Sequence, residues 1–249
     1  MIRMNSSDIE PRRVQSGRTR GTPPCKARTR GRMPVQTLVI LVAAIALGAG
    51  LWAGQRFFAG GAATDAPQLR GALAYPTPRE LPPFELQQAD GTPLDAAELA
   101  GRWTLVFFGF THCPDVCPTT LAQLAAAQER WSDLPAEDRP QVLFVSVDPE
   151  RDSPAKTGEY ARFFGPEILA ATAGHEVLEP FARSLGMLYM PAALDGSGGQ
   201  PAPGEPYTVD HSSKVAVLDP QVRLTALLKA PLDAAVVDAD LRALMAAQR

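Results

Sequence analysis

The chain has 249 residues, enough for one large domain or two small ones, with 45% hydrophobic residues and a net charge of −3. The charge is unevenly distributed: nine basic and two acidic residues up to Met33 give that segment a net of +7 and leave −10 for the rest. Such asymmetry suggests a nucleic-acid-binding arm, but an apolar run follows the basic segment directly and argues against one.

Residues 34–55 are predicted to form one transmembrane helix, because no ionisable residue occurs between Met33 and Gln55. At about 1.5 Å per residue, this run spans the roughly 30 Å hydrocarbon core of a bilayer. Positive residues stay on the cytoplasmic side, so 1–33 is expected to be a cytoplasmic tail. The prediction is a single-pass, N-in protein of the inner (plasma) membrane, with its C-terminal domain in the periplasm or another extracytoplasmic space. The alternative is a cleaved secretory signal, for which Ala62 and Ala63 offer small residues to a peptidase.

Residues 56–83 are rich in Gly, Ala and Pro and are predicted to be a tether, followed by a folded domain over 84–249. The predicted elements of that domain, in chain order, are a strand at 84–87, a helical turn at 94–99, a strand at 103–110, a helix through 121–130, a strand at 141–147, a helix at 154–164 capped by Ser153, a helix at 176–185, a short strand at 187–190, a loop at 191–206, a hairpin of 214–218 with 223–228, and a helix at 233–248. This order predicts an α/β, thioredoxin-like fold, a central mixed sheet flanked by helices.

Two thiols, Cys113 and Cys117, lie four residues apart where the 103–110 strand gives way to a helix. A helix beginning near Cys113 would turn both sulfurs to one face. The pair could then bind a soft metal or close into a redox disulfide. A purely structural disulfide is the weaker interpretation, because so short a loop gains little stability from chain entropy. The third cysteine, Cys25, lies in the polar tail and is expected to be an idle thiol.

Three motifs together resemble the Sco/SenC family of copper-handling proteins. They are GFTHCPDVCP at 109–118, SVDPERD at 146–152 and VDHS at 209–212, in that order. The resemblance implies that Cys113, Cys117 and His211 bind copper, as Cu(I) or Cu(II). It also implies a metallochaperone rather than an enzyme, serving assembly of the binuclear copper centre of cytochrome c oxidase. The implied partners are the copper-bearing oxidase subunit, other copper carriers and thiol reductants, and no nucleic acid is expected.

The residue chemistry agrees with that resemblance. Cu(I) prefers thiolate sulfur, whereas imidazole suits copper in either oxidation state, so a Cys₂His set can hold the ion through a redox change. A helix N-terminus lowers the pKa of a thiol, and copper binding should strengthen as pH rises through the thiol pKa values. His211 follows a Gly/Pro-rich stretch and is expected on a mobile loop.

Other residues with metal-binding or titratable groups receive weaker predictions. Asp148, at the end of its strand, could tune the copper site from outside the ligand set or simply cap a turn. His112 should point away from the shared thiol face, and His175 is expected in a turn. Met187 and Met190 are expected in the core rather than as thioether ligands.

Three other functions compete with copper delivery. An extracytoplasmic thiol-disulfide oxidoreductase, reducing cysteines of a copper-site partner, would use the same pair of thiols. The spacing is C-x-x-x-C instead of C-x-x-C, however, and Asp210-His211 carries no proline where thioredoxins have a cis-proline. A peroxidase needs an arginine that the sequence alone cannot place near the thiols. Structural zinc needs a fourth ligand, and none is evident.

Overall fold

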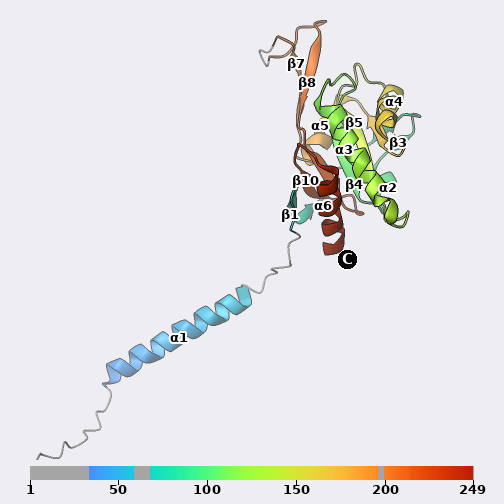
Figure 1. The fold of residues 1–249 in the computed structure, drawn as a ribbon. Helices are drawn as coiled ribbons and strands as arrows, with labels where there is room; N and C mark the ends of the chain where they lie inside the picture. Colours follow the sequence, from blue (N-terminus) through green and yellow to red (C-terminus); the bar gives the residue numbers. More distant parts are fainter. Residues whose placement is uncertain (1–33, 59–67, 196–198, 249) are drawn as a thin grey trace, which may run out of the picture. The chain divides into compact units, whose positions relative to one another are not determined.

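The computed structural model describes residues 34–58, 68–195 and 199–248. The chain divides into two compact units, residues 1–63 and 64–249 (Figure 1). The predicted basic tail, Cys25 and the cleavage alternative at residues 62 and 63 lie outside the described residues.

The described residues of the first unit, 34–58, form the helix α1 (Val35–Phe58). Its stretch Val35–Gly54 is long and apolar enough to cross a membrane. The predicted apolar helix at 34–55 is therefore confirmed as a helix, and its insertion into a bilayer stays a prediction.

The second unit is built on an eight-stranded sheet of order β1-β10-β9-β4-β5-β6-β2-β3. The strands are β1 (Ala72–Arg79), β2 (Leu86–Gln88), β3 (Pro93–Leu94), β4 (Thr104–Gly109), β5 (Gln141–Ser146), β6 (Leu169–Thr172), β9 (Val215–Leu218) and β10 (Leu224–Leu228). β4, β5 and β6 run parallel, and the other pairings are antiparallel. The predicted mixed sheet is confirmed. A separate antiparallel pair, β7 (Tyr189–Ala193) with β8 (Tyr207–His211), forms a hairpin.

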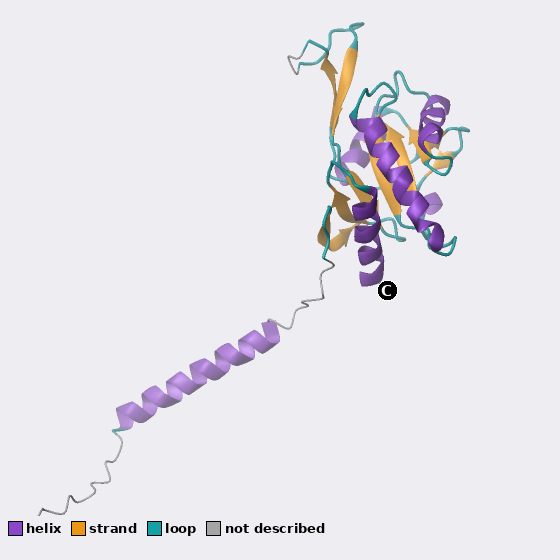
Figure 2. Ribbon diagram, viewed as in Figure 1, coloured by secondary structure: helices purple, strands orange, loops and turns teal. Residues whose placement is uncertain are grey.

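Helices lie against this sheet, as Figure 2 shows. They are α2 (Ala96–Leu99), α3 (Val116–Arg130), a 3₁₀ turn η1 (Trp131–Asp133), α4 (Pro154–Phe164), α5 (His175–Ser184) and α6 (Ala234–Ala247). The Ser153 hydroxyl accepts from the Lys156 amide, and Pro154 occupies the first helical position, as predicted for α4. Asp233 caps α6 in the same way through its carboxylate.

β4 is buried along its whole length, and alternate side chains face opposite sides of the sheet. Phe108 packs edge-on against Phe181 of α5, with ring centroids 5.7 Å apart. Phe107 points the other way, to Phe144 of β5 and to His211, at 6.2 and 6.0 Å. This second face carries the candidate site.

The predicted tether at 56–83 is wrong for residues 72–79, which form β1 and pair with β10. Pro76 and Pro78 suggested a loop, but β1 is an edge strand, where a missing backbone N–H costs no ladder bond. The strand's beginning is fixed by the Asp240 carboxylate, which accepts hydrogen bonds from the amides of Arg70, Gly71 and Ala72 at 2.7 to 2.8 Å.

Three more strands, β6, β7 and β8, differ from the prediction. β6 was not predicted, because its four residues, Leu169–Thr172, are too short a run to show a period. Only residues 191–193 of the loop expected at 191–206 belong to a strand, the end of β7, and the rest of its described residues are irregular. β8 begins directly after that loop and was not predicted as a strand. The strand expected at 187–190 lies two residues later.

Candidate metal centre

The two thiols lie at the carboxyl end of β4, where α/β sheets usually place their sites. The Cys113 amide donates to the Phe110 carbonyl at 3.2 Å, which closes a turn before the helix. Helix α3 begins at Val116, so the expectation of a helix beginning near Cys113 is wrong. Only Cys117 is helical, in the first turn, and Cys113 lies in the preceding loop.

The Cys113 sulfur acts as a cap for α3. The N-cap residue Asp115 makes no side-chain hydrogen bond to the helix, and the Cys117 amide points at Cys113 Sγ, at 3.4 Å. An N-terminal amide with no intrahelical partner stabilises negative charge on its acceptor. The helix terminus therefore favours the thiolate form of Cys113.

The thiol pair is electrostatically asymmetric. The pKa of Cys113 is lowered to about 4, chiefly by the hydrogen bond from the Cys117 thiol, and the neighbouring His211 and backbone amides also lower it against the effect of burial. The pKa of Cys117 is raised, because its proton is held by Cys113 and because the side chain is buried. Both cysteines are free thiols in the structure. The apo site thus holds one half-exposed thiolate and one buried thiol.

His211 completes the cluster from the last position of β8. Its Nε2 atom lies 3.4 Å from Cys117 Sγ, and the candidate ligand atoms of Cys113, Cys117 and His211 all lie within 4.8 Å of one another. The expectation of a mobile loop is wrong for this residue, because it pairs in register with Tyr189 of β7.

The His211 ring is held with its Nε2 lone pair facing the sulfurs. Its Nδ1 lies 3.3 Å from the Ser212 carbonyl, which can only accept, so the proton belongs on Nδ1 and Nε2 is left to bind. Phe107 and Phe110 meet the ring edge-on, at 6.0 and 5.9 Å between centroids. These contacts restrict the orientation of the imidazole.

Gly109, the last residue of β4, leaves just enough room for Cys117. A Cβ atom at this position would lie 2.7 Å from Cys117 Sγ and 2.9 Å from the Phe144 ring. Both distances are shorter than a van der Waals contact, so the buried sulfur requires glycine here.

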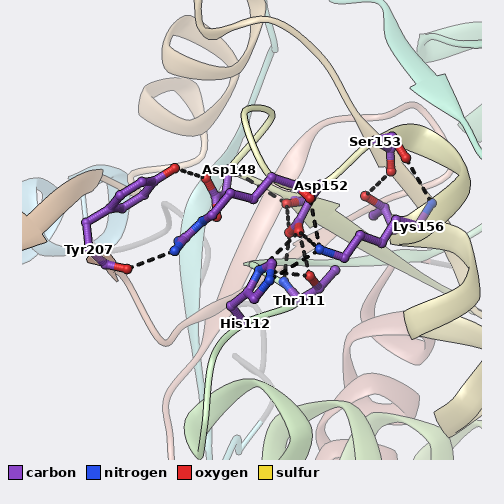
Figure 3. A network of polar contacts seen from close by, with 10 residues as sticks. Thr111, His112, Asp148, Asp152, Ser153, Lys156 and Tyr207 are labelled. Carbon is purple, nitrogen blue, oxygen red and sulfur yellow. Dashed lines mark hydrogen bonds and ion pairs between the residues drawn. The ribbon is translucent and has the colours of Figure 1, made fainter. Parts of the chain in front are cut away.

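Asp152 fixes the loop that carries Cys113, and its role was not predicted. Its buried carboxylate accepts from the Thr111 amide and from the Ser146 hydroxyl, each at 2.7 Å, and from the Thr111 hydroxyl. Lys156 adds an ion pair at 3.4 Å. Figure 3 shows Thr111 and Lys156 converging on the Asp152 carboxylate. Asp152 lies in the SVDPERD motif after β5, but its contact with Thr111 depends on the parallel pairing of β4 and β5, which brings the loops after these two strands together.

Asp148 is also buried, but its partners lie toward β8 instead of the sulfurs. It accepts from Arg151 Nε and, at 2.7 Å, from the Tyr207 hydroxyl. Its carbonyl also accepts from the amides of Arg151 and Asp152, so it closes the turn as well. The two alternatives for Asp148, turn former and outer partner of the site, are therefore compatible, and its influence on copper stays a prediction.

The remaining candidates lie outside the cluster. His112 faces Asp152 at 3.6 Å, and His175 is the first residue of α5, between Tyr189 and Glu150, instead of in a turn. Met187 is buried, as predicted, whereas Met190 is 54% exposed, so the core prediction is wrong for it.

A second group of possible metal ligands, His112, Asp148 and Asp152, occurs among the described residues. Its carboxylates already pair with Arg151 and Lys156, which leaves little net charge for a cation.

The donor set of the cluster fits a soft metal. Two sulfurs and one imidazole nitrogen suit copper, with thiolate favouring Cu(I) and imidazole serving both oxidation states. Closed structural zinc sites use four protein ligands, whereas the cluster found among the described residues has three. A three-ligand site with one half-exposed sulfur is also accessible to a partner's ligand.

Comparisons with known proteins place the chain in context. The SCO1/SenC family model matches residues 74–246. A putative copper-binding protein of Stutzerimonas stutzeri is 33% identical over 163 residues, 64% of this chain and 74% of that protein. Protein SCO1 homolog 1, mitochondrial, of Arabidopsis thaliana is 37% identical over 140 residues, which cover 56% of this chain but only 39% of that protein.

The fold is likewise similar to a solved structure. The crystal structure of Arabidopsis thaliana ScoI with copper bound gives a TM-score of 0.58 at 32% identity, over 68% of this chain and 98% of that one. The predicted thioredoxin-like fold is confirmed.

Proposed function

The chain belongs to the SCO1/SenC family, and from this premise we propose that it binds copper through Cys113, Cys117 and His211. The observation that carries the proposal is the convergence of two sulfurs and one unprotonated imidazole nitrogen within 4.8 Å. The relative named above as a putative copper-binding protein, and the structure similar to this one that has copper bound, support the same metal.

We further propose that the protein is a membrane-tethered chaperone that delivers copper to the copper-bearing subunit of cytochrome c oxidase. The exposed side of Cys113 suits transfer, because an incoming thiol or thioether can attack a three-coordinate ion without displacing a ligand first. Helix α1 would hold the chain in the inner membrane, N-terminus in the cytoplasm, with the copper domain in the periplasm. Other copper carriers or thiol reductants would load the site.

A second candidate function is thiol-disulfide exchange with a copper-site partner. The observation that favours it is the asymmetry of the pair, an accessible Cys113 thiolate beside a buried Cys117 thiol, which matches an attacking and a resolving cysteine. Oxidised to a disulfide, the same pair would be unable to bind copper.

Copper titration of the full chain in detergent, fully reduced and carrying Cys25→Ala, tests the proposal. We expect one tightly bound ion per chain. His211→Ala should lose most of its Cu(II) affinity, because Cu(II) prefers nitrogen over two soft sulfurs alone. Equal Cu(II) binding by the parent and the variant would remove His211 from the site.

Thiol exchange is measured on the same two proteins with a disulfide substrate. A protein that functions only as an oxidoreductase would keep its exchange rate in the His211→Ala variant and would show no stoichiometric copper binding.

A further inference from the structure

The strand that carries His211 is attached to the body of the domain at its other end. Tyr207, the first residue of β8, donates its hydroxyl to Asp148 Oδ1 at 2.7 Å, and its carbonyl accepts from Arg151 at 2.8 Å. Figure 3 shows the Tyr207 side chain reaching across to the Asp148 carboxylate. The hydroxyl remains a donor at all ordinary pH, because burial and then the Asp148 bond raise the pKa of Tyr207 to about 12.

Arg151 makes this attachment rigid. Arg151 Nε donates to the Asp148 carboxylate and Arg151 Nη1 donates to the Tyr207 carbonyl. Two nitrogens of the same planar guanidinium are therefore fixed. The guanidinium also lies over the Tyr207 ring, 3.7 Å from its centroid, and 5.8 Å from that of Phe110. Phe110 in turn meets the His211 imidazole. A continuous chain of contacts therefore runs from the Tyr207 end of β8 to the metal ligand.

The other strand of the hairpin is tied to the same loop. Glu150 contacts His175 Nε2 at 2.9 Å, and His175 Nδ1 contacts the Tyr189 hydroxyl at 2.9 Å. Tyr189 is the register partner of His211. Asp152, at the end of this loop, holds Thr111 before the thiols. Residues of the 148–152 segment therefore contact the histidine strand and the thiol loop directly, and they reach the neighbouring strand β7 through His175.

The geometry makes the imidazole sensitive to the Tyr207 contact. Tyr207 lies four positions before His211, a span of about 13 Å along a strand. A 2 Å shift of the Tyr207 end would tilt β8 by about 10°, using that strand length. Ligand groups must be held within roughly 0.5 Å and 10–20° of productive geometry, so a tilt of this size reaches the lower limit of the angular tolerance.

We propose that Tyr207 is a positioning residue for copper, which sets the orientation of His211 toward the two sulfurs through its contacts with Asp148 and Arg151. This inference rests on the proposed copper site. It concerns the Cu(II) state above all, because Cu(II) depends on the imidazole whereas Cu(I) is held chiefly by thiolates.

The test replaces Tyr207 by phenylalanine in the full chain, with Tyr75→Phe in β1 as the matched control. Losing a hydrogen-bond partner of a metal ligand typically weakens metal affinity about 10- to 100-fold. Because Tyr207 acts on His211 through other residues, we expect a Cu(II) loss at the lower end of this range, about 10-fold, in Tyr207→Phe. Cu(I) affinity should change much less, and Tyr75→Phe should change neither. The sulfur-to-Cu(II) absorption band and the copper hyperfine splitting should shift in Tyr207→Phe, a change that general destabilisation would not produce.

Arg151→Lys provides a second variant, because lysine keeps the charge beside Asp148 but loses the fork that also reaches the Tyr207 carbonyl. Arg151→Lys should reproduce the selective loss of Cu(II) affinity expected in Tyr207→Phe. Circular dichroism and the unfolding midpoint verify that both variants remain folded at the titration temperature.

Two failures are distinguishable. If the parent protein binds no copper, the proposed function itself is wrong. If the parent binds copper and His211→Ala loses Cu(II), but both Tyr207→Phe and Arg151→Lys retain parental Cu(II) affinity and spectra, only the positioning role is overturned. Equal losses of Cu(I) and Cu(II) would overturn it as well, since they would indicate a general structural effect.

Discussion

Replacing Asp152 by asparagine should loosen the thiol loop at a measurable cost in stability. The buried carboxylate accepts three hydrogen bonds, two from Thr111 and one from Ser146, and pairs with Lys156. An amide has one acceptor oxygen in place of two. In its better orientation it keeps the Thr111 amide and Ser146, but presents N–H to the Thr111 hydroxyl and to the Lys156 ammonium.

The magnitude follows from these contacts. A hydrogen bond to a charged group contributes about 1.5–3 kcal/mol, and a half-exposed ion pair about 1 kcal/mol or less. One lost charged bond and one lost ion pair predict that Asp152→Asn lowers the free energy of unfolding by about 2–4 kcal/mol at pH 7. Denaturant unfolding of the reduced apo protein, followed by tryptophan fluorescence, measures the change.

The pH dependence gives an independent check on the same variant. Burial alone would raise the pKa of Asp152, but the hydrogen bonds from Thr111 and Ser146 and the Lys156 charge hold it below 3.8. A carboxyl whose pKa is lower in the folded state stabilises the fold above its unfolded pKa and loses that contribution as pH falls. The difference in the free energy of unfolding between the parent and Asp152→Asn should therefore be constant above about pH 5 and shrink below about pH 4.

Asp90 offers a matched control, because it also accepts from the amide and the hydroxyl of one threonine, Thr92, but in an exposed turn. Asp90→Asn should change stability far less. A change below about 0.5 kcal/mol for Asp152→Asn, the range of ordinary surface substitutions, would refute the reasoning.

The remaining predictions concern the sulfurs. Gly109→Ala should lower the free energy of unfolding by about 1–3 kcal/mol, because the added methyl would lie 2.7 Å from Cys117 Sγ and overpack the core. The same crowding should slow copper uptake. Unchanged denaturation and unchanged uptake would contradict the close packing. The rate at which iodoacetamide alkylates apo Cys113 should follow a pKa of about 4. The rate should therefore stay constant from about pH 6 upward and fall toward pH 4. A midpoint near pH 8.5, about the pKa of a free thiol, would exclude a thiolate cap on the helix. Because the folded pKa lies below the unfolded one, Cys113→Ser should cost more stability at pH 8 than at pH 4, measured by the same denaturant unfolding.

Elements with a strong local signal were predictable from the sequence. β4 was recognised from its unbroken β-branched and aromatic run, and α4 from Ser153 followed by Pro154. The convergence of Cys113, Cys117 and His211 was predicted too, but from the resemblance to a family. Local propensity cannot bring together residues 94 positions apart.

Features that depend on tertiary pairing escaped prediction. β1 looked like a tether because its two prolines are tolerated only at the edge of a sheet that the sequence does not reveal. β8 looked like a loop because its five residues are stabilised by pairing with β7, not by a buried run of their own. Asp152 lay in a recognised motif, yet its partner Thr111 is brought to it by the parallel pairing of β4 and β5.

The central claim is that two sulfurs and one imidazole nitrogen bind the same copper ion. X-ray absorption of the reduced full chain with Cys25→Ala, loaded with one equivalent of copper, measures that ligand set directly. The account predicts two sulfurs and one nitrogen around each ion, with the nitrogen lost in His211→Ala. A first shell of three or four sulfurs, or a parent spectrum identical to that of the variant, would contradict it.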